Sequence, residues 1–121
     1  MSSTIKIKVN QGVVVGVQDK LPNDDDYCYF RGIPYAKPPI GVLRFKDPEP
    51  LEKFIEAELD CSEERDICFQ RSLIYGGYVG SEDCLFLNVY APKINDHITK
   101  KPVMIYIHGG AFTIDSGNSD L

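Results

Sequence analysis

The residues best suited to chemistry in this chain are residues 108–112, which read His-Gly-Gly-Ala-Phe and directly follow an apolar run at residues 103–107. If that run is a strand, the glycines form a turn at its C-terminal end and expose backbone N–H groups. Glycine has no side chain to block a reacting group that approaches these donors. Preorganised N–H groups stabilise negative charge that develops on an oxygen atom. The stretch therefore predicts either an anion-stabilising turn or, more simply, a tight turn after a strand.

The run at residues 103–107, Val-Met-Ile-Tyr-Ile, is typical of a strand that is buried on both faces. Such a strand needs helices or a second layer on each side. The sequence predicts no long amphipathic helix, only a short one within residues 63–75. We therefore expect the covering layers to lie beyond Leu121, in a larger domain of which this chain is a part. The alternative is a free-standing β-rich binding module.

Strand patterns dominate the rest of the chain. Alternation of apolar and polar side chains, or a short apolar run, predicts strands in four stretches, the first two forming a hairpin: residues 5–9, 13–15, 27–30 and 85–91. Residues 32–50 contain five prolines, which excludes a helix or a central strand there. Because this stretch also carries large apolar residues, we expect an ordered loop packed onto the body of the protein.

Composition and charge exclude several classes of protein. A content of 43% hydrophobic and 26% charged residues is that of a globular chain, not a disordered or fibrous one. The formal net charge of -5 argues against a nucleic-acid or anionic-membrane partner. The first ten residues lack the apolar core of a signal peptide, which favours an intracellular protein. With two histidines and no Cys-x-x-Cys pair, the sequence predicts no metal site.

The cysteines leave two alternatives open. The four of them, Cys28, Cys61, Cys68 and Cys84, are too few for a disulfide-dense scaffold. An even number is still compatible with disulfides. Reduced, packed thiols fit equally well with the absence of a visible signal peptide.

Three blocks of sequence, read together, resemble a known family. They are residues 30–45, residues 80–92 and residues 102–112. In this order and spacing they are similar to the N-terminal portion of a type-B carboxylesterase, in the cholinesterase-like branch of the α/β-hydrolases. The middle block, Gly-Ser-Glu-Asp-Cys-Leu-Phe-Leu-Asn-Val-Tyr-Ala-Pro, closely matches the family pattern Glu-Asp-Cys-Leu-x-Leu-Asn-Val. The resemblance covers nearly the whole chain and is most specific to insect esterases without a secretion signal.

This resemblance implies an α/β fold, the α/β-hydrolase fold, with residues 1–121 as the N-terminal part of one domain. That part would comprise a β-hairpin, a packed proline-rich loop and the first strands of the central sheet. The activity implied is that of a serine carboxylic ester hydrolase that forms an acyl-enzyme, without metal or organic cofactor. Its partner would be a small-molecule ester, with neither nucleic acid nor membrane, and its oligomeric state is left open.

The catalytic triad of the family is expected outside this chain. In the family the serine lies in a Gly-x-Ser-x-Gly turn and is followed by an acid and then a histidine. No such pentapeptide occurs here, and both histidines, His97 and His108, precede any position for it. Residues 1–121 alone are therefore expected to be inactive. A non-catalytic, esterase-like adhesion or binding protein is the alternative of another class.

The resemblance also assigns roles at the glycine-rich turn. The backbone N–H groups of Gly110 and Ala111 would stabilise the oxyanion, with Gly109 shaping the turn. Many relatives have glycine where this chain has Ala111. His108 adjoins the turn and could serve as a general base. The resemblance instead implies a structural histidine that holds the turn by a hydrogen bond.

Two further pairs are assigned by resemblance alone. Cys68 and Cys84 match the first disulfide of the family, which would form in an oxidising setting. Arg44 and Glu82 match a salt bridge that would tie the proline-rich loop to the strand beginning near residue 85. On that basis, substitution of Glu82 by glutamine is expected to harm folding by leaving a partly buried Arg44 unpaired.

Overall fold

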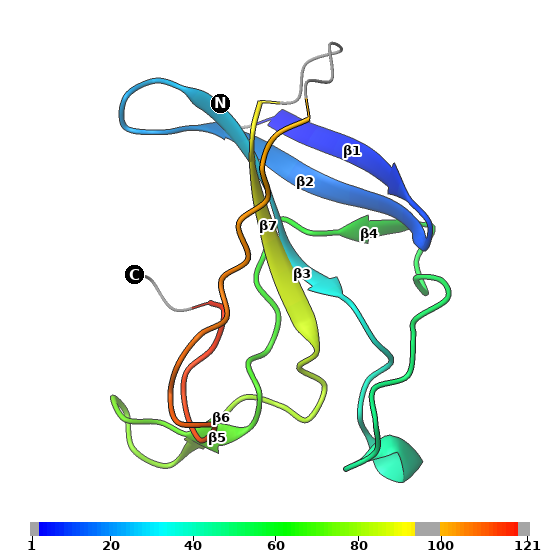
Figure 1. Ribbon diagram of the computed structural model, residues 1–121, viewed down its shortest axis with the longest axis vertical. Helices are drawn as coiled ribbons and strands as arrows, with labels where there is room; N and C mark the ends of the chain where they lie inside the picture. The colour runs from blue at the N-terminus through cyan, green and yellow to red at the C-terminus, as the bar shows by residue number, and fades with distance from the viewer. Residues whose placement is uncertain (1–2, 94–99, 119–121) are drawn as a thin grey trace.

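Among the described residues, the regular secondary structure is almost entirely β-strand, and long loops connect the strands (Figure 1). The computed structural model describes residues 3–93 and 100–118. In chain order its elements are β1 (Ser3–Val9), β2 (Gly12–Lys20), β3 (Asp26–Pro34), the 3-10 helix η1 (Gly41–Leu43), β4 (Glu58–Asp60), β5 (Gln70–Arg71), β6 (Tyr78–Val79) and β7 (Phe86–Pro92). The main sheet has the order β1-β2-β3-β7 with β4 beside β2, and β5 and β6 form a separate pair. Among the described residues η1 is the only helix, so the helical layers of an α/β fold are not represented there.

The first hairpin lies where the sequence pattern predicts it. β1 and β2 pair antiparallel in unbroken register along the whole of β1. Ile5 and Ile7 pack against the buried core, whereas Lys6 and Lys8 are exposed. Because alternate side chains of a strand face opposite sides, the alternation fixes which face of β1 is buried.

The core lies where β2, β3 and β4 meet. The first half of β2 pairs parallel with β4, and its second half pairs antiparallel with β3. Gly16 permits this close packing, because a Cβ at that position would collide with the carbonyl oxygen of Tyr29 and the ring of Phe30. The buried cluster is small and consists of Val14, Cys28, Phe30, Leu59 and Cys61.

β3 and β7 form the other half of the sheet and confirm the strands predicted at residues 27–30 and 85–91. They pair antiparallel, with one irregularity between Phe30 and Ile33. Gly32 lies in this bulge with a φ of 66°, a conformation that favours glycine. After the bulge β3 continues to Pro34, so it extends into the stretch predicted as a loop.

The proline-rich loop is ordered, but the prediction that its apolar residues pack it onto the body is wrong for most of them. Its two limbs are joined by the N–H of Lys37 and the carbonyl of Glu49, 2.9 Å apart. Ile40 is 50% exposed and Phe45 is 91% exposed. Proline, backbone hydrogen bonds and the ion pair between Lys37 and Glu49 therefore hold its shape, and Ala36 is buried.

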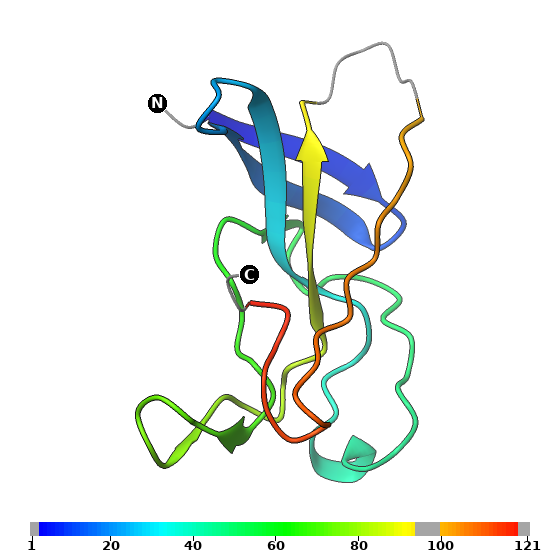
Figure 2. The ribbon, with the colours of Figure 1, turned by 60° about the vertical axis from the view of Figure 1, so that its left-hand side comes forward.

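Residues 103–107 are not a strand in this structure, which corrects the prediction of a strand buried on both faces. Their side chains are between 61% and 96% exposed. Figure 2 shows this segment as an extended trace beside the sheet that joins none of its strands. The physical reason is that a strand exists only as part of a ladder, and no described segment supplies a neighbour.

The short helix predicted within residues 63–75 is also wrong. This region contains a parallel bridge between Cys68 and Ser81, followed by the two-residue strand β5. Leu73 and Ile74 are 74% and 83% exposed, so no apolar helix face is buried here. Long-range pairing with residues 78–81 therefore decides the conformation, and local helix propensity does not.

Candidate active-site turn

The last three residues of the turn at residues 108–112 have a left-handed backbone. Gly110, Ala111 and Phe112 have φ values of 99°, 53° and 61°. Gly110 must be glycine, because a Cβ there would collide with the carbonyl oxygen of Ile114. Ala111 and Phe112 carry side chains in a region that costs an L-residue roughly 1–2 kcal/mol. Non-glycine residues in this conformation are often found at functional sites.

One carbonyl closes the turn. The oxygen of Gly110 accepts from the N–H of Thr113 at 3.0 Å, from the N–H of Ile114 at 3.2 Å and from the hydroxyl of Thr113 at 3.2 Å. Among the described residues, the N–H groups of Gly110 and Ala111 have no hydrogen-bond acceptor. Three hydrogen bonds within the turn thus converge on the carbonyl oxygen of Gly110, whereas the two N–H donors stay available to a ligand oxygen.

His108 is the first residue of the turn and is exposed to solvent. Its Nδ1 is 2.8 Å from the carbonyl oxygen of Gly109. A carbonyl only accepts, so Nδ1 carries the hydrogen and donates it. This contact is of the kind expected for a structural histidine, and the role of His108 stays a prediction.

Polar side chains from elsewhere anchor the segment that follows the turn. Gln70 Nε2 donates to the carbonyl of Asp115 at 2.9 Å. Asn88 Nδ2 donates to Asn118 Oδ1 at 3.0 Å, and Asn118 Nδ2 donates to the carbonyl of Arg65 at 2.9 Å. Sequence reasoning did not single out Gln70 or Asn88. The sequence signal for Asn88 was its place between apolar residues in a predicted strand. A partly buried asparagine there needs a hydrogen-bond partner.

The two pairs assigned by resemblance each have one member within residues 80–84. Cys68 and Cys84 form a disulfide with a Cα–Cα distance of 4.8 Å. An ion pair joins Arg44 Nε to Glu82 Oε1. The side chains of Arg44 and Glu82 are 57% and 45% exposed, so the expected partly buried arginine is not present here. An exposed pair of this kind contributes about 0–1 kcal/mol.

Comparison with known protein families matches residues 3–120 to the carboxylesterase family. The chain belongs to the carboxylesterase family. The resemblance inferred from the three sequence blocks is thereby confirmed. The match includes the glycine-rich turn, the disulfide and the Arg44–Glu82 pair.

Individual carboxylesterases give the same result. The juvenile hormone esterase of Tribolium castaneum is 41% identical over 111 residues, which cover 90% of this chain and 18% of that protein. A solved PNB esterase structure has a TM-score of 0.75 and 40% identity, covering 94% of this chain and 22% of the other. Juvenile hormone esterase from Manduca sexta, solved with OTFP covalently attached, has a TM-score of 0.65 and 35% identity, covering 74% and 18%. The chain thus spans about a fifth of the length of these carboxylesterases, which are of the α/β-hydrolase type.

The two remaining cysteines of this carboxylesterase chain are free and fully buried. Burial raises the pKa of the Cys61 thiol to about 11 and also raises the pKa of Cys28. Both groups therefore stay protonated near neutral pH. Since the thiolate is the reactive form, Cys28 and Cys61 are packing residues and not nucleophiles.

No group of three or more His, Cys, Asp and Glu side chains in residues 3–93 and 100–118 could hold a metal ion. In the same part of the chain, no helix has the length and apolar character needed to cross a membrane.

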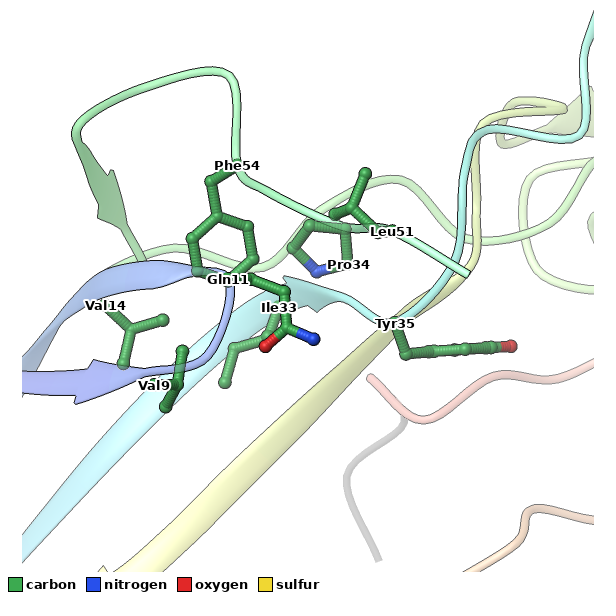
Figure 3. Close-up of a pocket in the computed structure, with 8 residues that line it drawn as sticks. All are labelled: Val9, Gln11, Val14, Ile33, Pro34, Tyr35, Leu51 and Phe54. Carbon is green, nitrogen blue, oxygen red and sulfur yellow. The ribbon is translucent and has the colours of Figure 1, made fainter. Parts of the chain in front are cut away.

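A cavity of about 250 Å³ opens at the end of the first hairpin (Figure 3). Its lining is mostly apolar, with Gln11 and Tyr35 as its polar side chains, and comprises Val9, Gln11, Val14, Ile33, Pro34, Tyr35, Leu51 and Phe54. None of residues 108–112 lines it. The cavity is therefore lined by no serine, cysteine or histidine and lacks the free donors of the turn, so the turn remains the candidate site.

Proposed function

We propose that residues 1–121 are the N-terminal part of a carboxylic ester hydrolase with the α/β-hydrolase fold. The turn at residues 108–112 supplies its oxyanion donors. The observation that carries the proposal is the left-handed turn with the free N–H groups of Gly110 and Ala111, in a chain of the carboxylesterase family. The rest of the domain corresponds to the four-fifths of its relatives' length that this chain does not cover.

In this proposal a serine beyond Leu121 attacks the carbonyl carbon of a small-molecule ester. A histidine takes the serine proton, and an acid orients that histidine. As the carbonyl becomes tetrahedral, its oxygen gains negative charge and moves between the N–H groups of Gly110 and Ala111. Each donor of this kind lowers the barrier by about 3–4 kcal/mol, because it is already in place when the charge develops. The methyl group of Ala111 narrows the approach but leaves the N–H available.

The disulfide bears on where the protein matures. A bond between Cys68 and Cys84 persists in oxidising compartments and is rare in the cytosol. It therefore favours an oxidising compartment over the intracellular location expected from the N-terminal sequence. Cys28 and Cys61 remain thiols in either setting, because both are fully buried.

The test is ester hydrolysis by the full-length protein that contains this chain. We expect release of p-nitrophenol from p-nitrophenyl acetate and stoichiometric covalent labelling by a fluorophosphonate, which reacts with activated serines. The matched control is residues 1–121 alone, which should show neither. Absence of both hydrolysis and labelling in the full-length protein would overturn the proposal and favour a non-catalytic, esterase-like binding protein.

A further inference from the structure

The turn at residues 108–112 is held from its C-terminal side. On its N-terminal side, residues 103–107 are exposed and make no backbone hydrogen bond within the described part of the chain. They therefore do little to fix where the turn lies. Among the described residues, the first hydrogen bond that links the turn to the body comes after it, at Asp115.

The turn and its tail form one unit. The three bonds to the carbonyl oxygen of Gly110 tie Thr113 and Ile114 to the start of the turn. Asp115 follows immediately, and the N–H of Asn118 donates to Ser116 Oγ at 3.1 Å. A displacement of residues 115–118 is therefore passed to the N–H groups of Gly110 and Ala111 through a short, internally bonded segment.

Asn88 holds this tail with both ends of its amide. Its Oδ1 accepts from the N–H of Gly32 at 2.8 Å, in the bulge of β3. Its Nδ2 donates to Asn118 Oδ1 at 3.0 Å and to the carbonyl of Gly117 at 3.4 Å. The carbonyl oxygen of the Asn88 amide is thus bonded to the sheet, and its NH₂ group is bonded to residues 117 and 118 of the tail.

Gln70 makes a second, separate attachment. Its Nε2 donates to the carbonyl of Asp115 at 2.9 Å and to the carbonyl of Cys68 at 3.0 Å. Cys68 is fixed by its disulfide to Cys84, so this attachment has a rigid base. The two side chains hold opposite ends of residues 115–118.

We infer that Asn88 and Gln70 are positioning residues for the oxyanion donors of Gly110 and Ala111. The inference rests on the proposed ester hydrolase function. Neither residue would touch the substrate. Both act through residues 115–118, which they hold against the sheet and the disulfide. Oxyanion donors must be held within about 0.5 Å of the productive position, and a misplacement of about 1 Å can cost roughly 100-fold in rate.

The first test is Asn88→Asp in the full-length protein. This change retains the acceptor for Gly32 and removes both donors to the tail. We expect kcat to fall about 10- to 100-fold with KM unchanged, because the oxyanion interaction exists only in the transition state. The affinity for a trifluoromethyl ketone, whose serine adduct carries the same oxyanion, should fall by the same factor as kcat/KM. Asn23→Asp is the matched control, since it makes the same change in the exposed loop between β2 and β3 and should leave both values unchanged.

The second test is Gln70→Glu, which removes both donated hydrogen bonds at the other end of the tail. We expect kcat to fall about 3- to 10-fold, again with ketone affinity falling in parallel. Gln18→Glu is its control, because within the described part of the chain Gln18 makes a side-chain hydrogen bond only through Oε1, which accepts from Ser3 Oγ and is retained as a carboxylate oxygen. Gln70→Glu also serves if Asn88→Asp fails to fold.

The outcomes separate this inference from the function on which it rests. An inactive wild-type protein overturns both. An active wild-type protein whose Asn88→Asp and Gln70→Glu variants keep their kcat and ketone affinity overturns the positioning role alone. A fall in activity that follows the melting temperature, with no separation of kcat from KM, shows a merely structural role and also overturns it.

Discussion

The sheet around β2 and the segment that carries the turn are stabilised in different ways. In the sheet, Val14 and Phe30 are 3% and 4% exposed, and every strand pairs with at least one neighbour. In the segment of residues 100–118, Met104 is 96% exposed and Phe112 is wholly exposed. The sheet thus depends on apolar burial and backbone ladders, and the turn depends on a few polar side chains.

This difference has a consequence for function. Burial of apolar surface is not directional, so it stabilises the sheet without fixing the direction of any single group. A hydrogen bond contributes only about 0.5–1.5 kcal/mol to stability, but it fixes distance and direction. Asn88 and Gln70 are therefore expected to matter more for the position of the oxyanion donors than for the stability of the fold.

The largest effect should come from a substitution that breaks the turn and spares the sheet. Gly110→Ala places a methyl group against the carbonyl of Ile114 at a φ of 99°. We expect kcat for p-nitrophenyl acetate to fall about 100- to 1,000-fold, because the donors leave their positions. The melting temperature should change little, since the turn is outside the buried core.

A suitable control for Gly110→Ala is Gly76→Ala. Gly76 also has a positive φ, 71°, but a Cβ there meets no atom within 4 Å. Gly76→Ala therefore introduces the strain of a side chain at positive φ, but it causes no steric collision. Equal activity of the two variants would show that the turn does not carry the oxyanion donors.

The opposite experiment breaks the sheet and spares the turn. Gly16→Ala forces a methyl group against Tyr29 and Phe30 at the centre of the core. We expect the free energy of unfolding of the full-length protein to fall by about 1–3 kcal/mol, as in other overpacked cores. Chemical denaturation measures it, with Gly109→Ala as a control that places its Cβ in open space. Below its melting transition the Gly16→Ala protein should keep the kcat of the wild type. A loss of kcat in this variant without loss of stability would contradict the separation of the two regions.

The same contrast explains what the sequence could predict. The strands β1 and β2 could be predicted from local sequence. In a strand with one buried face, every second side chain is buried, so the alternation in β1 and the short valine run in β2 indicate which residues face the core. The turn was located for a related reason, since the glycines that it requires are adjacent in sequence. Its donors Gly110 and Ala111 were named by resemblance, and their role stays a prediction.

The sequence did not predict those parts of the structure that depend on residues far apart in the chain. The strand predicted at residues 103–107 has the right composition but no neighbour among the described residues. The attachment of Asn88 to Gly32 spans 56 positions, and that of Gln70 to Asp115 spans 45. No local pattern encodes such pairs. The helix predicted within residues 63–75 failed for the same reason, since Cys68 pairs with Ser81 instead.

The smallest effect is expected at the ion pair between Arg44 and Glu82, which lies outside both the buried core and the turn. Because both side chains are about half exposed, Glu82→Gln should lower the free energy of unfolding by no more than about 1 kcal/mol. This replaces the expectation of a folding defect, which assumed a partly buried arginine. Denaturation of the full-length protein at low and high salt measures the effect, and any loss should diminish at high salt. A loss of about 3 kcal/mol or more would mean that the rest of the protein buries this pair, since breaking a buried pair leaves an uncompensated charge.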